Sequence, residues 1–145
     1  MEPRVSIITL GVDDLDRAVS FYEAMGLERH PKFTDGVAFY QMGGIILALW
    51  PREHLAKDAG LDPARLSGSA VALAYNTRTA EEVASTLAQA EAAGGSILKA
   101  ARKADWGGVQ GYFEDTEGNL WEVAWNPDFP IDDEGRTTLP PKTAN

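Results

Sequence analysis

The chain has 145 residues, 44% of them apolar, which is enough for one domain with a buried core. Its net charge of −9 argues against nucleic acid as a partner, because binding to phosphates requires clustered Lys and Arg side chains. The absence of cysteine excludes a disulfide framework, a thiolate metal site and a cysteine nucleophile.

The sequence also lacks the marks of a membrane or secreted protein. No apolar run reaches the length of a membrane-spanning helix. The opening MEPRVSIITL has neither the basic region nor the long apolar stretch of a signal peptide. We therefore expect a soluble, cytoplasmic protein with no membrane partner.

The first half of the chain predicts strands around one helix. Residues 5–12, VSIITLGV, are β-branched and apolar, which favours a buried strand. The aspartates that follow predict the start of a helix, and apolar residues recur at helical spacing until Gly26 ends it. A weakly marked short strand is expected around 28–33, and clearer strands at 36–42 and 44–50.

The second half predicts the same order of elements. Residues 69–77 are strand-like, and the sequence TAEE that follows has the form of a capping box. An apolar helical stripe then runs to the glycines at 94–95. Three further strands are predicted at 96–100, 108–114 and 119–125.

Each half therefore has the order β-α-β-β-β, which indicates an internal repeat. We expect one α+β domain over residues 1–128, with module one at about 4–51 and module two at about 69–128. The linker at about 52–68 predicts a single helical turn. The tail, residues 129–145, lacks periodicity and is expected to extend over the surface or to fray.

Two stretches carry a resemblance to a known family. The opening ITLGVDDLDRAVSFYEAMGL and the closing YFEDTEGNLWEVAWNP are similar to motifs of the vicinal oxygen chelate superfamily, and the resemblance covers roughly residues 4–127. This superfamily includes glyoxalase I, bleomycin-resistance proteins, fosfomycin-resistance enzymes and extradiol dioxygenases. The resemblance implies the glyoxalase/bleomycin-resistance fold, in which two βαβββ modules form a mixed sheet that encloses one cleft, commonly in a homodimer.

The resemblance also implies four metal-ligand positions that face this cleft in metal-dependent members. In this sequence they fall on Ile7, Ala48, Ala72 and Glu122, or on Leu47 in place of Ala48 if the register slips by one residue. Only Glu122 carries a donor, and one carboxylate cannot hold a divalent ion. We therefore expect no metal and no other cofactor. The histidines, His30 and His54, lie outside the predicted cleft strands.

Glu122 is the residue whose surroundings matter most. It lies between Trp121 and Val123 in a strand predicted to be half buried, where an unpaired carboxylate is costly. One hypothesis makes Glu122 the polar anchor of the cleft, which accepts a hydrogen bond from a ligand or transfers a proton. The alternative is a carboxylate satisfied by a neighbouring Tyr, Gln or backbone amide, without a function.

Aromatic and neutral polar residues complete the predicted site. Flat aromatic walls favour planar or cationic organic ligands, and the glycines next to Trp106 would let that loop swing over a ligand. The predicted ligand-binding residues are Trp50, Tyr75, Asn76, Trp106, Gln110, Tyr112 and Glu122.

Three functions are compatible with this pattern. The first is a metal-independent protein that binds a small organic molecule in the cleft, as bleomycin-resistance proteins do. The second is a lyase or isomerase that uses Glu122 as its general acid or base, although the sequence identifies no group to hold the developing negative charge. The third is a metal enzyme of glyoxalase or dioxygenase type, in which His54 or a residue of a second chain completes the ligand set.

Overall fold

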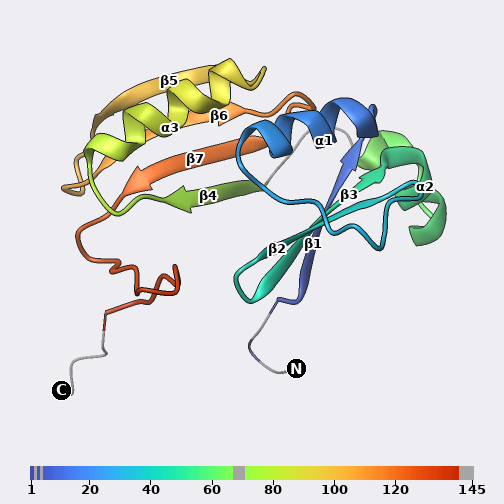
Figure 1. The fold of residues 1–145 in the computed structure, drawn as a ribbon, viewed down its shortest axis with the longest axis horizontal. Helices are drawn as coiled ribbons and strands as arrows, with labels where there is room; N and C mark the ends of the chain where they lie inside the picture. Colours follow the sequence, from blue (N-terminus) through green and yellow to red (C-terminus); the bar gives the residue numbers. More distant parts are fainter. Residues whose placement is uncertain (2, 4, 67–70, 141–145) are drawn as a thin grey trace.

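The computed structural model describes residues 1, 3, 5–66 and 71–140. It contains two sheets, one of three strands in the order β1-β3-β2 and one of four strands in the order β4-β7-β6-β5. Figure 1 shows these sheets side by side, with α1 near the middle of the molecule and α3 along the four-stranded sheet. No helix in the described ranges is long and apolar enough to cross a membrane.

The first module forms the three-stranded sheet. Its elements are β1 (Ile7–Val12), α1 (Leu15–Ala24), β2 (Ala38–Met42) and β3 (Ile45–Pro51). The Asp14 side chain caps α1 by accepting a hydrogen bond from the backbone N–H of Arg17, as the sequence predicts. The weak strand expected around 28–33 is reduced to one isolated bridge between Arg29 and Tyr40.

The second module forms the four-stranded sheet. Its elements are β4 (Ala72–Asn76), α3 (Glu81–Ala92), β5 (Ser96–Lys103), β6 (Val109–Glu114) and β7 (Leu120–Trp125). In both modules the first strand pairs with the last one in parallel, and the middle strands are antiparallel. The repeated order of elements predicted from the sequence is therefore also a repeat of topology.

Two local predictions were wrong. The linker holds more than one helical turn, because α2 spans Arg52–Ala59 and a 3₁₀ helix follows at Pro63–Leu66. Gly60 ends α2 in the left-handed conformation, with φ of 68°. At α3, only half of the expected capping box forms: Glu82 accepts from the backbone N–H of Thr79, but the Thr79 side chain makes no cap bond.

The first ten residues of the tail fold back on the second module. The Arg78 guanidinium donates to the backbone carbonyls of Ile131 and Asp132, at 3.2 and 2.9 Å. A bridge between Ile131 and Thr137 closes the turn. From residue 133 to residue 140 this segment is exposed to solvent.

The hydrophobic core joins the two modules through α1. Phe21 and Tyr22 on α1 are almost fully buried, and their rings lie against Phe113 and Trp121 of the second module. The helix-facing sides of both sheets therefore meet in the core, and the sides turned away from the helices are left open.

A polar contact reinforces this junction. The Tyr22 hydroxyl donates to Asp115 Oδ2 at 2.6 Å and accepts from Trp121 Nε1 at 3.1 Å. One turn earlier on α1, Arg17 pairs with the buried carboxylate of Glu117 at 2.7 Å. The opening and closing motifs of the sequence thus contact each other, and we call these contacts the junction clamp (Arg17, Tyr22, Asp115, Glu117, Trp121).

Candidate functional site

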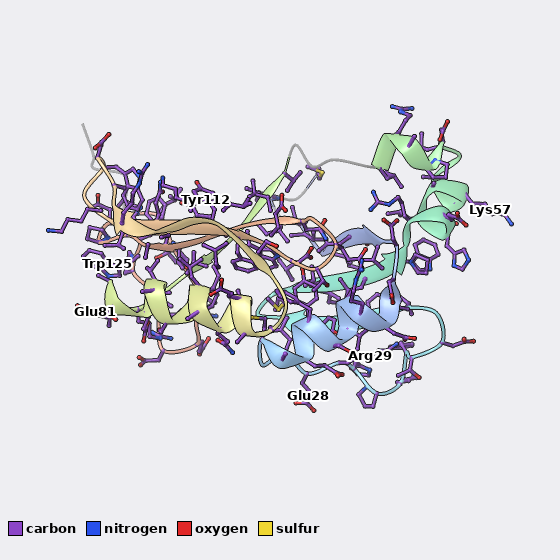
Figure 2. All side chains as sticks on the ribbon, turned by 90° about the horizontal axis from the view of Figure 1, so that it is seen from above. Glu28, Arg29, Lys57, Glu81, Tyr112 and Trp125 are labelled. Carbon is purple, nitrogen blue, oxygen red and sulfur yellow. The ribbon has the colours of Figure 1, made fainter. Side chains whose placement is uncertain are left out.

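Strand alternation gives β7 two different faces. Trp121 and Val123 are buried against the helix side, whereas Glu122 between them points to the other side and is half buried. Tyr112 is paired with Glu122 in the sheet register, and Figure 2 shows it on the side of the sheet away from α3. We call this side the open face, defined by Lys99, Gln110, Tyr112 and Glu122, with Ala72, Ala74 and Asn76 beside them.

The Glu122 carboxylate has a hydrogen-bond partner on this face. In the orientation that satisfies both of its neighbours, the Gln110 amide nitrogen donates to Glu122 Oε1 at 2.9 Å. The amide oxygen of Gln110 then accepts from Lys99 Nζ at 3.1 Å. The amide therefore connects a carboxylate to an ammonium group, which explains how the carboxylate is tolerated in this strand.

Tyr112 completes the polar group. Burial, the negative charge of Glu122 and a hydrogen bond to that carboxylate all raise the pKa of the Tyr112 phenol. The Lys99 ammonium lies 5.6 Å from the centre of the Tyr112 ring, within the range of a cation–π contact. These four side chains thus combine one ammonium, one carboxylate and two neutral groups that donate hydrogen bonds, and Arg102, which is paired with Gln110, lies on the same face.

Lys99 is the member of this group that the sequence analysis missed. Ile97, two residues earlier, packs on the core, so simple alternation would place Lys99 on the helix side as well. The register shows one irregularity between Ile97 and Lys99, and a second between Lys99 and Arg102. The first irregularity pairs Lys99 with Tyr112 and brings it to the open face.

Small side chains leave space beside Glu122. Ala74 is its partner in the parallel β4–β7 pairing, and both Ala72 and Ala74 are exposed to solvent. Asn76 lies on the same side, next to Ala124 in the register. A molecule could therefore approach the carboxylate from the β4 side without displacing a bulky group.

The open side of the first module is different in character. A hollow of about 380 Å³, which we call the module-one hollow, is lined by Ile7, Thr9, Asp35, Val37, Phe39, Ala48 and Trp50. Its walls are mainly apolar and aromatic, and Ile7 is 48% exposed. All of these residues belong to the first module, so Trp50 and the group around Glu122 lie in separate parts of one chain.

The comparisons with known proteins agree with this architecture. The sequence profile of the Glyoxalase/Bleomycin resistance protein/Dioxygenase superfamily matches residues 4–123. The chain belongs to this superfamily. The resemblance and the fold class that the sequence predicts are therefore confirmed.

Solved structures of the superfamily show the same fold. A glyoxalase-related enzyme from Fulvimarina pelagi is 36% identical, with 94% of this chain and 98% of that chain covered and a TM-score of 0.86. A glyoxalase/bleomycin resistance protein/dioxygenase from Nocardioides is 25% identical, with 86% and 84% covered and a TM-score of 0.71. A lactoylglutathione lyase from Agrobacterium tumefaciens is 24% identical, covers 87% and 96%, and has a TM-score of 0.65. Among curated proteins there is no significant match.

The metal site implied by the superfamily does not fit the residues of this chain. Ile7 and Ala48 lie in the module-one hollow and Ala72 lies on the open face, but none of them has a donor atom. Within the described residues, no group of three His, Asp or Glu side chains is close enough together to hold a metal ion. His54 lies on α2 with its ring 6.5 Å from that of Trp50.

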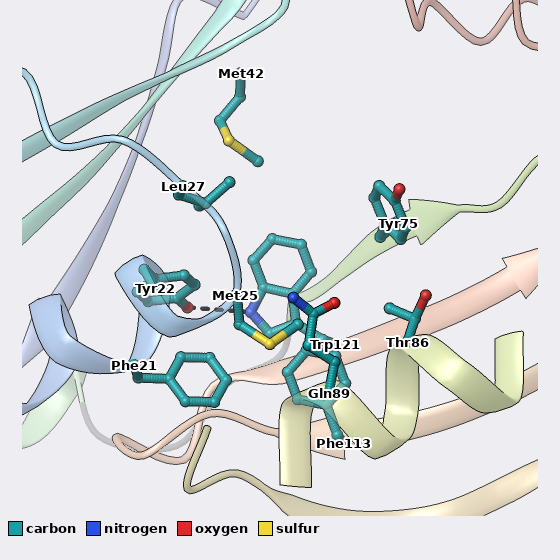
Figure 3. A pocket seen from close by; sticks show the side chains of 10 residues that line it. All are labelled: Phe21, Tyr22, Met25, Leu27, Met42, Tyr75, Thr86, Gln89, Phe113 and Trp121. Atoms are coloured by element: carbon teal, nitrogen blue, oxygen red, sulfur yellow. Dashed lines mark hydrogen bonds between the residues drawn. The ribbon is translucent and has the colours of Figure 1, made fainter. Parts of the chain in front are cut away.

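Two predicted ligand-binding residues have unexpected positions. Tyr75 lies on the helix side of β4, away from Glu122. It lines a pocket of about 210 Å³ together with Phe21, Tyr22, Met25, Leu27, Met42, Thr86, Gln89, Phe113 and Trp121. Figure 3 shows this pocket between α1 and α3, with the Tyr22–Trp121 hydrogen bond in its wall. The alternation of β4 could have predicted this position, because Tyr75 is paired with the core residue Val123.

Trp106 lies in a tight turn instead of a free loop. The backbone N–H of Ala104 donates to the Gly108 carbonyl at 2.9 Å, and the N–H of Gly107 donates back to Ala104 at 3.0 Å. The Trp106 ring occupies the place of a side chain on Gly108, where an added Cβ would lie 1.9 Å from the ring. Gly108 is thus required for packing, and the expectation of a swinging loop was wrong.

Proposed function

We propose that this chain binds a small organic molecule at the open face of the second module and does so without a metal ion. The observation that carries this proposal is the group of polar side chains around Glu122, which is half buried, internally hydrogen-bonded and accessible past Ala74. Ligand sites commonly combine an apolar surface with a few convergent polar groups of this kind.

The module-one hollow supplies the apolar half of the proposed cleft. Its Trp50 and Phe39 side chains offer flat surfaces for a planar ligand. Because the hollow and the open face lie apart in one chain, we propose a homodimer in which the hollow of one copy lies over the open face of the other. Two equivalent clefts would result from such a twofold arrangement.

Lys99 supports the metal-independent form of the proposal. Its ammonium group brings a positive charge to the side of the sheet that carries Glu122. A cation at this point would balance the carboxylate or attract an anionic or carbonyl oxygen of a ligand. Such an attraction is the electrostatic role that a divalent ion would otherwise have.

The test is a fragment-binding experiment on protein treated with EDTA. Small aromatic and carbonyl compounds are screened by saturation-transfer NMR, and hits are mapped by backbone amide shifts. We expect the shifts to include Gln110, Tyr112 and Glu122, and we expect Glu122→Gln to weaken binding by about tenfold, the equivalent of one charge-assisted hydrogen bond.

A matched control is Glu91→Gln, which removes an exposed carboxylate from α3, on the other side of the sheet, and should leave binding unchanged. The proposal fails if hits map only to the pocket around Tyr75, or if binding appears only after a divalent metal is added.

A further inference from the structure

The pocket between α1 and α3 lies on the helix side of the second sheet, away from Glu122, and the proposed binding function does not use it. Its floor consists of four buried rings that come from both modules: Phe21, Tyr22, Phe113 and Trp121. The rings of Phe113 and Trp121 are stacked, with their centres 6.1 Å apart and their planes at 2°. The floor therefore presents aromatic surface that the core already holds in place.

The mouth of the pocket is partly polar. Thr86 and Gln89 lie three residues apart on α3, where Thr86 is half buried and Gln89 is exposed. Figure 3 shows Tyr75 and Thr86 on one side of the pocket, and Leu27 and Met42 on the other. Within the described residues, the hydroxyl groups of Tyr75 and Thr86 and the amide of Gln89 have no hydrogen-bond partner. These three groups can therefore bond to a ligand without breaking a contact within the protein.

The size and charge of the pocket restrict what it can hold. No charged side chain is among the residues that line it, all of which the structure describes. A charged ligand would lose hydration there without gaining an opposite charge, which is costly. The volume of about 210 Å³ exceeds the roughly 150 Å³ of a cavity that holds one benzene molecule. The walls include the thioethers of Met25 and Met42, which make favourable contacts with aromatic rings.

We propose that this pocket is a second binding site, separate from the open face, for a small neutral molecule with one aromatic ring and one hydrogen-bonding group. The ring lies on the aromatic floor, in contact with Met25 and Met42. Its polar group bonds at the mouth, to Tyr75, Thr86 or Gln89. Because α1 and β7 both contribute rings to the floor, a bound molecule also connects the two modules.

The experiment follows the signals of isotope-labelled methionine methyl groups by NMR. Met25 and Met42 line the pocket, and Met1 at the exposed N-terminus is the internal reference. Phenol and benzamide are the neutral probes, and benzoate and benzylammonium are charged probes with the same ring. We expect phenol or benzamide to shift Met25 and Met42, with a dissociation constant of about 1 mM or below. Both charged probes should bind at least about tenfold more weakly, because their charge has no partner in the pocket.

Two variants assign the shifts to the pocket. Tyr75→Ala removes an aromatic wall and should weaken binding by about tenfold. The Tyr75 side chain is 52% exposed, so its removal leaves the core intact. Phe33→Ala is the matched control, because Phe33 is 47% exposed and does not line the pocket. This control should leave binding unchanged.

Several outcomes would overturn this inference. The first is that neither neutral probe shifts Met25 and Met42 at about 10 mM, well above the expected dissociation constant. The second is that the charged probes bind as tightly as the neutral ones, or that Phe33→Ala weakens binding as much as Tyr75→Ala. If Met25 and Met42 shift on dilution and no probe binds, a second copy of the chain covers the pocket. The binding function of the open face is judged separately, by the shifts of its own residues.

Discussion

Glu122 lies beside a phenol and an amide, and the amide leads to an ammonium group. These partners come from three strands, because Lys99 is on β5, Gln110 and Tyr112 are on β6, and Glu122 is on β7. Strand alternation alone predicts that Gln110, Tyr112 and Glu122 share a face. It cannot predict Lys99, whose direction depends on an irregularity in the pairing of β5 with β6.

The pKa of the Tyr112 phenol depends on the charge of Glu122, so it can be used to detect that charge. Burial and the Glu122 carboxylate raise its pKa above the usual value of about 10. The folded state therefore holds this proton more tightly than the unfolded state, and this contribution to stability is lost as pH rises through the folded-state pKa. In Glu122→Gln the charge is removed and only burial remains, so the pKa should move back toward 10.

NMR titration of the Tyr112 ring carbons checks this expectation, with Tyr112→Phe used for assignment. Glu114→Gln serves as the control and should leave the titration unchanged. A Tyr112 pKa that does not respond to Glu122→Gln would mean that the two side chains are not in contact.

At the scale of the element, β6 approaches α3 and β5 closely at one glycine. A Cβ on Gly111 would lie 2.4 Å from Leu87 Cδ1 and 2.7 Å from the backbone oxygen of Lys99. The strand β5 can follow its irregular path because no side chain at 111 pushes it away. Gly111 thereby helps to hold Lys99 in position.

We expect Gly111→Ala to destabilise the fold by about 1–3 kcal/mol, the usual cost of overpacking, and to shift the NMR signals of Lys99. Gly44→Ala is the matched control, because no atom lies within 4 Å of its added Cβ. Urea unfolding gives the two free energies. Equal stabilities for both variants would contradict the close packing at Gly111.

Among the helices and strands, the helix in the linker is the one that its sequence pattern predicts least well. The stretch PREHLAKDAG is polar and has few apolar residues, so only a single turn was predicted, yet α2 runs from Arg52 to Ala59. Its start is held by tertiary contacts, in which Arg52 pairs with Asp13 at 2.9 Å and donates to the Leu66 carbonyl at 2.6 Å. Contacts between distant residues of this kind override local propensity.

At the scale of the whole molecule, the two family motifs join the modules. The resemblance predicts the fold correctly, but it does not predict that Tyr22 of the opening motif bonds to Asp115 of the closing motif. Asp115 is 4% exposed and also accepts from the backbone N–H groups of Glu117 and Asn119. The junction clamp therefore fixes the closing turn and α1 in one arrangement.

Tyr22→Phe tests the clamp. Loss of the hydroxyl leaves the Trp121 N–H without its acceptor and removes one donor from Asp115, which should lower the free energy of unfolding by about 1–3 kcal/mol. Tyr75→Phe removes a hydroxyl from a residue that is 52% exposed, and should change stability by less than about 0.5 kcal/mol. Urea denaturation of both variants is the measurement, and a neutral Tyr22→Phe would contradict a stabilising clamp.

The proposed dimer also belongs to this scale. Ile7→Lys places a charge in the module-one hollow, where the partner's open face would lie, and should produce monomers in sedimentation velocity experiments. Val5→Lys, just outside the strand at an exposed position, is the control and should leave the association unchanged. A wild-type protein that sediments as a monomer at all concentrations would exclude the dimeric cleft.

The central claim is that Lys99, Gln110, Tyr112 and Glu122 form a binding site that works without a metal ion. Its most direct test is elemental analysis of the purified protein after incubation with zinc, nickel, manganese and iron(II) and subsequent desalting. We expect metal contents at background level, equal in wild type and Glu122→Gln. Nearly one metal ion per chain in wild type, lost in Glu122→Gln, would contradict it.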